Sequence, residues 1–289
     1  MKTKSWFSSK RISRLKNKKD GKIIVDNQNE NNDIFENQEI KKDLKMFYEK
    51  EAKKYTETRK KFWYEEKIIL ESISPLFTEW KKVHILEFWC WSWRFATLLN
   101  QNFSGKFDYV WIDLSAELLS YASKDNPNLT FLQWDITKLI KNFEQESFDL
   151  IVWTSSFQHI PTNMERSFLM KNFYRLLNYD WTLLMTNWSL SKRFTKKHRD
   201  LVFKAKILSW IKLNSWSARD LMVPRTDNEW NIYERFYHFF SLKELENLAN
   251  FSWLTLKINT FIDWDGNFTN DEKISRSSFF VAKKTPIIQ

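Results

Sequence analysis

One stretch, residues 83–95, constrains the fold of this chain more than any other, and it reads VHILEFWCWSWRF. An apolar run ends in Glu87 and a helical pattern follows the turn, which predicts a buried strand, a turn and a helix in succession. Trp89, Trp91 and Trp93 occupy alternate positions of the turn. Three indoles have no evident use there, whereas three glycines would let the backbone bend tightly and approach a ligand closely.

The tryptophan and glycine contents are both unusual. The 289 residues include 16 Trp and only 3 Gly, whereas an average glycine content of roughly 7% predicts about 20 Gly. The simplest account is a gene in which the codon UGA means glycine, translated as if it meant tryptophan; a protein that is genuinely rich in tryptophan is the alternative. Further Trp lie at turns or strand edges, where glycine is common, namely Trp111, Trp134, Trp181, Trp230 and Trp253. Trp63 and Trp188 lie within apolar patterns, which favours tryptophan itself.

Apolar strands alternate with helices along most of the chain, which is typical of a doubly wound, mostly parallel α/β sheet. Strands are predicted over residues 83–88, 109–113, 130–133, 148–154 and 182–187, followed by an antiparallel hairpin of 254–261 and 278–283. Helices are predicted between Met46 and Pro75 and over residues 94–100, 115–123, 164–177 and 241–250, with Ser115 as an N-cap.

Composition divides the chain into a tail and a domain. Residues 1–45 are polar and predict a disordered tail, so the folded domain is expected to span residues 46–289. A basic insertion, residues 189–240, interrupts the alternation before the last helix and contains a predicted helix over 197–213.

The length and the cysteine content limit the possible protein classes. A chain of 289 residues can bury a sizeable core in one large domain or two small ones. No apolar run approaches 18 residues and none follows the basic N-terminus, so neither a membrane-spanning helix nor a signal peptide is expected. Cys90 is the single cysteine and cannot form an internal disulfide. We expect a cytoplasmic protein with no metal site and no membrane contact.

The net charge of +10 is unevenly placed. Residues 1–22 carry a balance of +8, residues 23–45 a balance of −3, and residues 189–225 again +8. Two basic clusters indicate a polyanionic partner such as RNA, although solvated lysines are the alternative. The residues expected to contact RNA are Lys192, Arg193, Lys196 and Lys197.

Three acids end successive predicted strands. Glu87 ends the first strand, Asp113 ends the second, and Asp135 follows the third beside Ile136. In doubly wound sheets ligands bind beyond the carboxyl ends of the strands, so these carboxylates are expected to share one site. A carboxylate at the position of Asp113 can accept hydrogen bonds from both hydroxyls of a ribose.

With glycine at its three Trp positions, the opening stretch closely resembles the first motif, E/D-x-G-x-G-x-G, of the class I S-adenosylmethionine-dependent methyltransferases. The resemblance implies S-adenosylmethionine as the cofactor and a seven-stranded sheet of order 3-2-1-4-5-7-6 with strand seven antiparallel. It also implies that Glu87 holds the amino-acid end of the cofactor, that the backbone at positions 89, 91 and 93 lies against the cofactor, and that Asp135 and Ile136 flank its adenine.

The loop after the fourth strand reads TSSFQHIP and is expected to face the cofactor and the substrate. Ser155 is a candidate cofactor contact. His159 is a candidate general base or substrate contact, and a packing histidine is the alternative. A D/N-P-P-Y signature, which is typical of enzymes that methylate amino groups, is absent, so methylation of adenine or glutamine nitrogen is disfavoured.

Two flanking motifs carry a narrower resemblance, which covers residues 46–284. They resemble the tRNA wobble-uridine carboxymethyl methyltransferases, which carry T-R-x-x-x-W near the N-terminus and V-P…R-Y-Y-H-x-F before the last helix. The matching residues are Thr58, Arg59, Trp63, Val223, Pro224, Arg235, Tyr237, His238 and Phe240. Arg225 departs from the pattern, because that family usually has Trp after Val-Pro.

This resemblance implies methyl transfer to a carboxylate on a modified uridine of tRNA. Arg59, Arg235 and His238 are candidates to hold the substrate carboxylate or phosphate, and a structural ion-pair network is the alternative for these three residues. Eukaryotic members work with a small activator protein, a partner that the sequence neither requires nor excludes. Two other functions stay open, namely methylation of another RNA or a small molecule, and RNA binding without catalysis.

Overall fold

The computed structural model describes residues 28–59, 64–78, 81–89, 94–210, 217–227 and 229–286, with side chains from residue 38 onward except those of residues 55, 58 and 59. The chain divides into residues 1–36 and residues 37–289. Only the helical residues 28–36 of the first part are described. The second part holds the sheet and every site considered below.

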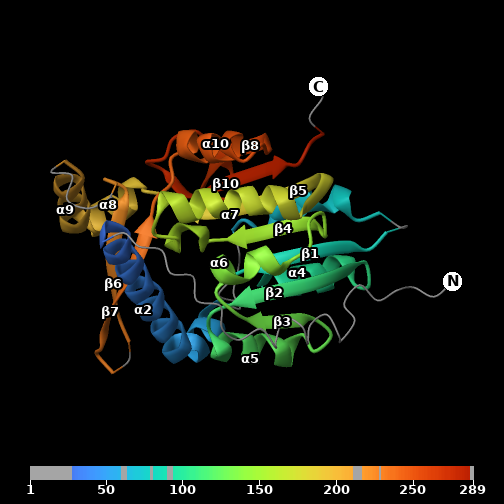
Figure 1. Ribbon diagram of the computed structural model, residues 1–289, viewed down its shortest axis with the longest axis horizontal. Coiled ribbons are helices and arrows are strands. Elements are labelled where there is room, and N and C mark those ends of the chain that lie inside the picture. The colour runs from blue at the N-terminus through green and yellow to red at the C-terminus, as the bar shows by residue number, and fades with distance from the viewer. Residues whose placement is uncertain are drawn as a thin grey trace. The chain divides into compact units, whose positions relative to one another are not determined.

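An eight-stranded sheet forms the centre of the second part, with strand order β3-β2-β1-β4-β5-β10-β8-β9 (Figure 1). The strands are β1 (Val83–Phe88), β2 (Phe107–Asp113), β3 (Thr130–Gln133), β4 (Phe148–Thr154), β5 (Leu177–Trp188), β8 (Thr255–Asp263), β9 (Phe268–Thr269) and β10 (Ser275–Lys283). The strands β1 to β5 are parallel, and β10 is antiparallel to both of its neighbours. The predicted order 3-2-1-4-5-7-6 is therefore confirmed, with β8 as strand six and β10 as strand seven; the two-residue β9 was not predicted.

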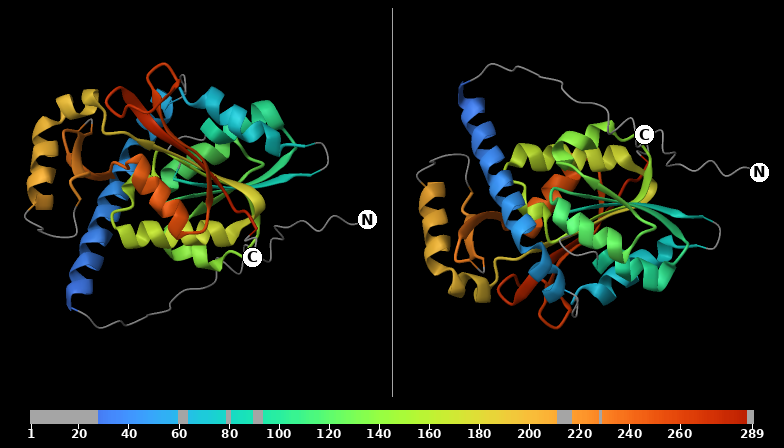
Figure 2. Two further views of the ribbon diagram at one scale, coloured as in Figure 1. Left: turned by 90° about the horizontal axis from the view of Figure 1, so that it is seen from above. Right: turned by 90° about the horizontal axis from the view of Figure 1, so that it is seen from below.

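Helices cover both faces of this sheet (Figure 2). One face packs against α3 (Glu66–Ile73), α4 (Arg94–Phe103) and α5 (Ala116–Asp125) through a core that includes Ile69, Phe95 and Leu119. The other face packs against α7 (Asn163–Leu176), whose Phe173 lies 5.6 Å from the rings of both Phe88 and Trp153. Helix α10 (Leu242–Phe251) lies beside α7 and β8. The burial of apolar strands on both faces explains why β1 and β4 are almost continuously apolar.

Short helices and side-chain caps complete the connections. These are α6 (Ile136–Leu139) and the 3₁₀ helices η1 (Ser74–Leu76), η2 (Ile140–Asn142) and η3 (Phe157–His159). Ser115 caps α5 by accepting a hydrogen bond from the Leu118 backbone N–H, as predicted. Thr162 and Ser241 cap α7 and α10 in the same way, which fixes where these helices begin.

The long helix α2 (Gln28–Arg59) corrects the predicted tail boundary. Residues 28–45 were expected to be disordered, but they are helical, and the buried Ile40 and Leu44 lie one turn apart. A sparse apolar stripe in a polar sequence is a weak signal, because packing rather than composition stabilises such a helix. Residues 1–27 of the predicted tail lie outside the described residues.

The basic insertion also differs from its prediction. Instead of one helix over 197–213, it contains α8 (Lys192–Lys197) and α9 (Arg199–Trp210), and residues 211–216 lie outside the described residues. It then forms an antiparallel hairpin of β6 (Asp220–Thr226) and β7 (Ile232–His238), which was not predicted. The insertion is therefore a helical pair with a two-stranded sheet rather than a purely helical segment.

Candidate functional site

The predicted acids meet at one edge of the sheet. Glu87 and Asp113 lie at the carboxyl ends of the neighbouring strands β1 and β2, and Asp135 follows β3 as the N-cap of α6, directly before the buried Ile136. Ser155 follows β4 on the same edge. The structure thus brings these residues together as their spacing predicted, and their roles in binding stay predictions.

Asp113 has an incompletely satisfied carboxylate. Its Oδ1 atom accepts a hydrogen bond from the Ser115 backbone N–H at 2.9 Å, whereas Oδ2 is buried and has no hydrogen-bond partner within the described part of the chain. Burial raises the pKa of Asp113 to about 7. A buried carboxylate oxygen without a donor costs free energy, so this atom marks a place where a ligand hydroxyl can donate.

Trp89 fills the space beside that carboxylate. The two residues line a cavity of only about 10 Å³, together with Leu114 and residues of α2. Trp89 is buried, its backbone has a φ of 42°, and its indole N–H has no acceptor among the described residues. A bulky residue with positive φ is strained. Trp91 and Trp93 lie outside the described residues.

The other two acids already have partners. Glu87 is fully buried and accepts a short hydrogen bond from the Tyr109 hydroxyl. Asp135 accepts from the Thr137 backbone N–H at 3.0 Å, and Lys41 Nζ lies 3.6 Å from its other oxygen. Lys41 comes from α2, so this helix reaches the carboxyl edge of the sheet.

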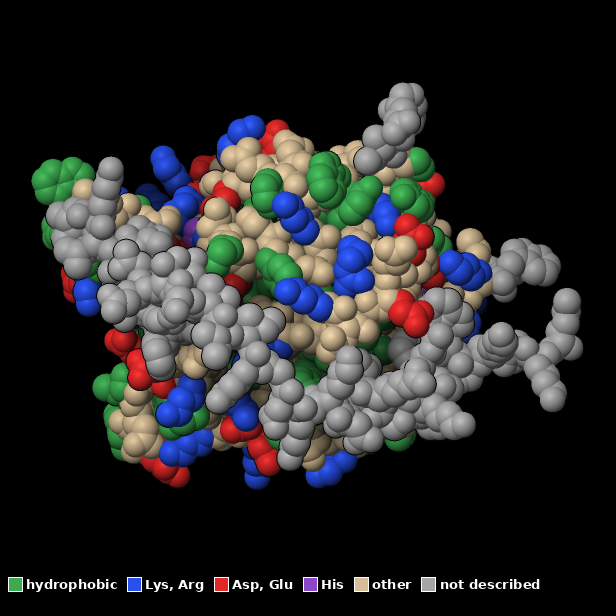
Figure 3. Space-filling model, viewed as in Figure 1, with side chains coloured by type: hydrophobic (Ala, Val, Ile, Leu, Met, Phe, Trp, Pro, Cys, Tyr) green, Lys and Arg blue, Asp and Glu red, His purple; other side chains and the backbone are tan. Residues whose placement is uncertain are grey.

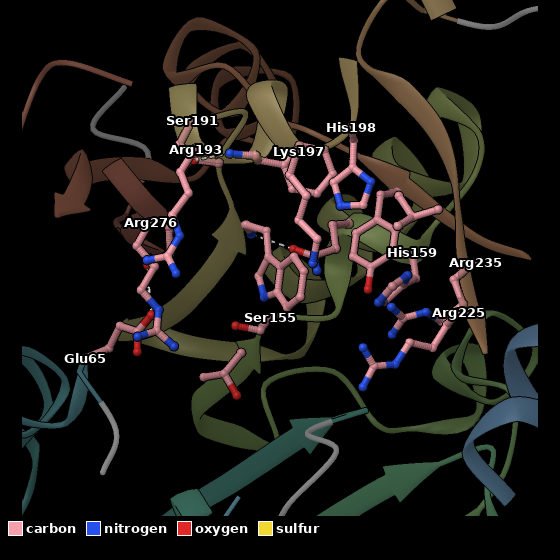
Figure 4. Close-up of a pocket in the computed structure, with 18 of the residues that line it drawn as sticks. Glu65, Ser155, His159, Ser191, Arg193, Lys197, His198, Arg225, Arg235 and Arg276 are labelled. Atoms are coloured by element: carbon pink, nitrogen blue, oxygen red, sulfur yellow. Dashed lines mark hydrogen bonds between the residues drawn. The ribbon is translucent and has the colours of Figure 1, made fainter. Parts of the chain in front are cut away.

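A cavity of about 430 Å³ opens beyond the carboxyl ends of β4 and β5 (Figure 4). Its walls come from η3, α8, the hairpin β6–β7 and the start of β10. Six basic side chains line it, and the only acid among its described lining residues is Glu65. The basic residues are Arg94, Arg193, Lys197, Arg225, Arg235 and Arg276. Such a lining selects an anionic ligand.

His159 lines this cavity but is unsuited to proton transfer at neutral pH. It is buried, and burial lowers its pKa to about 3. Its Nδ1 atom lies 2.6 Å from the carbonyl oxygen of Phe236, so the neutral ring donates there and presents Nε2 as an acceptor. The packing role expected as the alternative is thus present, and a substrate contact through Nε2 stays a prediction.

Arg235 lies in the cavity wall, and its contact with substrate stays a prediction. Its Nη1 donates to the Tyr48 hydroxyl at 3.0 Å, and its guanidinium lies 4.9 Å from the centre of the Phe47 ring. Tyr48 was not predicted as a site residue, although it lines both this cavity and the small one beside Asp113. Arg59 ends α2, and its side chain lies outside the described residues.

His238 is in a buried ion network rather than in the cavity lining. Its Nδ1 lies 2.5 Å from Asp220 Oδ1 and its Nε2 lies 2.7 Å from Glu244 Oε1. This corrects the prediction that His238 contacts substrate, because both ring nitrogens are already bound to carboxylates. The structural network expected as the alternative is the observed one.

Sequence analysis also missed Arg276 and Gln158 as lining residues. Arg276 lies at the start of β10, beside the end of β5, where Ser277 pairs with Trp188. An antiparallel strand begins where its parallel neighbours end, so the position of Arg276 next to the site follows from the predicted topology. The described residues contain no cluster of His, Cys, Asp or Glu that could hold a metal ion. No helix in the described part is long and apolar enough to cross a membrane.

Comparisons with known proteins agree with this geometry. Residues 85–180 match a family model described as a methyltransferase domain. No curated protein matches the chain. The solved structure of an S-adenosylmethionine-dependent methyltransferase from Methanosarcina mazei is 17% identical, with a TM-score of 0.54 over 74% of this chain and 97% of that one.

Two further solved structures share the fold. A methyltransferase from Clostridium acetobutylicum is 16% identical, with a TM-score of 0.52 over 77% of this chain and 92% of its own. A complex of DhpI with SAM and HEP is 14% identical, with a TM-score of 0.55 over 84% of this chain and 97% of its own. The sheet of this chain therefore has the Rossmann-like methyltransferase fold.

Proposed function

We propose that the chain is an S-adenosylmethionine-dependent methyltransferase and that it methylates the carboxylate of a modified wobble uridine in tRNA. The match of residues 85–180 to a methyltransferase family model and the shared fold support the activity. The basic cavity carries the proposal, because six Lys or Arg side chains and one Glu among the described residues line a space beyond β4 and β5. A carboxymethyl group and the phosphates of RNA both have the charge that this lining favours.

The chemistry suits the groups that are present. A carboxylate is already deprotonated at neutral pH, so its methylation needs no general base, and the enzyme mainly has to hold the acceptor oxygen in line with the methyl group. His159, with a pKa lowered to about 3 by burial, is a hydrogen-bond acceptor under these conditions. Arg235, held by Tyr48, supplies the charge that fixes a carboxylate.

The basic side chains of α8 support RNA as the molecule that carries the modified uridine. Arg193 and Lys197 line the cavity, while the neighbouring Lys192 and Lys196 are exposed, so positive charge continues from the cavity onto the surface. On the face that Figure 3 shows, Lys and Arg side chains are scattered among apolar and acidic ones. The convergence of cations at the cavity therefore favours RNA phosphates near α8.

We also propose that the natural protein has glycine at positions 89, 91 and 93, through reading of UGA as glycine. With Trp89, the residues at this edge do not fit S-adenosylmethionine, because the indole occupies the space beside Asp113. Among the described residues, six other than glycine have positive φ, and three of them are Trp89, Trp230 and Trp253. Glycine is the residue that such backbone positions favour.

Calorimetry with S-adenosylmethionine tests the glycine proposal. We expect no measurable binding to the chain as written and binding to the triple variant Trp89→Gly/Trp91→Gly/Trp93→Gly. Trp210→Gly, at an exposed helical position, is the matched control and should not bind. Equal binding by the written chain and the triple variant would refute the proposal, and mass spectrometry of the natural protein gives an independent reading of these positions.

Methyl transfer tests the substrate. The triple variant is incubated with radiolabelled S-adenosylmethionine and with tRNA whose wobble uridine carries a carboxymethyl group. We expect a base-labile methyl ester, and no label on the same tRNA with an amide in place of the acid. Label that withstands base, or equal labelling of the amide, would show that the acceptor is not the carboxylate.

A further inference from the structure

Four of the basic side chains that line the large cavity lie on two opposite walls. In Figure 4, Arg193 and Arg276 lie on one side with Glu65, whereas Arg225 and Arg235 lie on the other. One uniform cluster would suit a single anion anywhere in the cavity. Two separated groups suit a ligand with an anion at each end.

The wall with Arg276 is supported by aromatic rings. The Arg276 guanidinium lies 3.9 Å from the centre of the Tyr64 ring and 5.3 Å from that of Trp264, whose ring also lies 4.5 Å from Arg193. Contact with these rings supports both guanidinium groups in the cavity wall, where their charge favours an anionic group. Glu65, on the same wall, accepts from the Ser277 hydroxyl at 2.8 Å, and its single charge is outweighed by two arginines.

The wall with Arg235 adjoins the cofactor edge of the sheet. Tyr48 accepts the hydrogen bond from Arg235 and also lines the small cavity beside Asp113. An acceptor group bound at Arg235 therefore lies on the side of the cavity that shares Tyr48 with the site beside Asp113. The other wall includes Arg193 of α8, whose exposed neighbours Lys192 and Lys196 continue the positive charge outward.

We propose that the cavity binds two anions of one substrate together, a carboxylate at Arg235 and a phosphate at Arg193 and Arg276. The substrate class is then a nucleotide with an acidic group on its base. Guanidinium groups bind phosphate in a bidentate manner, and a cavity of about 430 Å³ lies within the range of ligand sites of roughly 300–1,000 Å³. The assignment of the carboxylate as the group that is methylated rests on the proposed function. The phosphate site is argued only from the positions of Arg193 and Arg276 in the cavity wall.

Binding of four small molecules to the full chain tests this division. The molecules are uridine and 5-carboxymethyluridine, each with and without a 5′-phosphate, and calorimetry gives their dissociation constants. In the unmodified chain we expect each anion to tighten binding by about tenfold. In Arg193→Gln/Arg276→Gln the phosphate should no longer lower the dissociation constant, while the carboxymethyl group should still lower it. Arg235→Gln should show the opposite pattern.

The control is Lys106→Gln, which removes an exposed cation at the opposite end of the sheet, where Val83 begins β1. It should keep both gains, and the binding of uridine itself shows that each variant has folded. A phosphate gain that survives in Arg193→Gln/Arg276→Gln, or falls equally in Arg235→Gln, overturns the second anion site. A carboxymethyl group without effect in every protein overturns the proposed function instead, so the two failures are distinguishable.

Discussion

His238 lies between two carboxylates, with Asp220 Oδ1 2.5 Å from Nδ1, and this pair joins the two strands of the insertion hairpin. On the other side, Glu244 of α10 lies 2.7 Å from Nε2. The contact between His238 and Glu244 therefore ties the hairpin, which supplies Arg235 to the cavity, to the helix α10.

Loss of the His238 side chain should destabilise the protein more than it affects ligand binding. In His238→Leu, Asp220 and Glu244 lose their shared partner, and breaking a buried pair from one side typically costs about 3–5 kcal/mol. We expect the free energy of unfolding in urea to fall by that order. In the variant His238→Leu/Asp220→Asn most of the loss should be recovered, because a buried charge is removed. A single variant as stable as the unmodified chain would contradict this role.

Two exposed tryptophans give a matched test of backbone strain. Trp230 and Trp210 are 85% and 84% exposed, but Trp230 has a φ of 66° whereas Trp210 ends the helix α9. Trp230→Gly should raise the free energy of unfolding by roughly 1 kcal/mol, because glycine adopts positive φ without strain. Trp210→Gly should lower it by up to about 1 kcal/mol, since glycine is a poor helix former. Equal effects of both changes would remove the conformational argument for glycine at position 230.

The sheet was predictable because strands that are buried on both faces are continuous apolar runs in the sequence. The run from Phe148 to Thr154 is almost entirely apolar and ends in a polar residue, so its bounds could be predicted. The alternation of such runs with helices predicted a parallel sheet, whereas the strand order was implied by the family resemblance. The acids at their carboxyl ends then meet by topology alone. Glu87, Asp113 and Asp135 could therefore be placed at one edge of the sheet from the sequence alone.

The hairpin β6–β7 and the wall residues were missed for a different reason. Pro224 and Arg225 within β6 weaken its strand pattern, and a two-stranded ribbon can tolerate such residues because both strands are edges. Tyr48 and Arg276 lie 228 positions apart in the numbering, and they share a cavity only through tertiary packing. A local sequence pattern cannot predict that two such distant residues line the same cavity.

Salt dependence should reveal whether α8 binds phosphates. If Lys192, Arg193, Lys196 and Lys197 contact RNA, the logarithm of tRNA affinity should fall linearly with the logarithm of salt concentration. Replacement of all four by Ala should flatten that slope by up to about 4, because each phosphate contact contributes nearly 1. Filter binding between 50 and 200 mM salt, roughly the range in which such effects are large, measures the slope. A slope that is unchanged would leave these side chains as solvated surface.

The buried carboxyl of Asp113 should make stability depend on pH in an unusual direction. Its pKa is raised by burial to about 7, above the value of about 4 expected in the unfolded chain. The folded state therefore holds this proton more tightly, and the stabilisation is complete below about pH 4 and is lost as the pH rises toward 7. Asp113→Asn stays neutral and keeps an acceptor for the Ser115 N–H. At pH 8 we expect it to be more stable than the unmodified chain, by up to about 4 kcal/mol, and at pH 4 to be no more stable. Urea unfolding at both pH values, without cofactor, measures the difference, and two parallel pH curves would show that Asp113 is ionised in the folded chain at little cost.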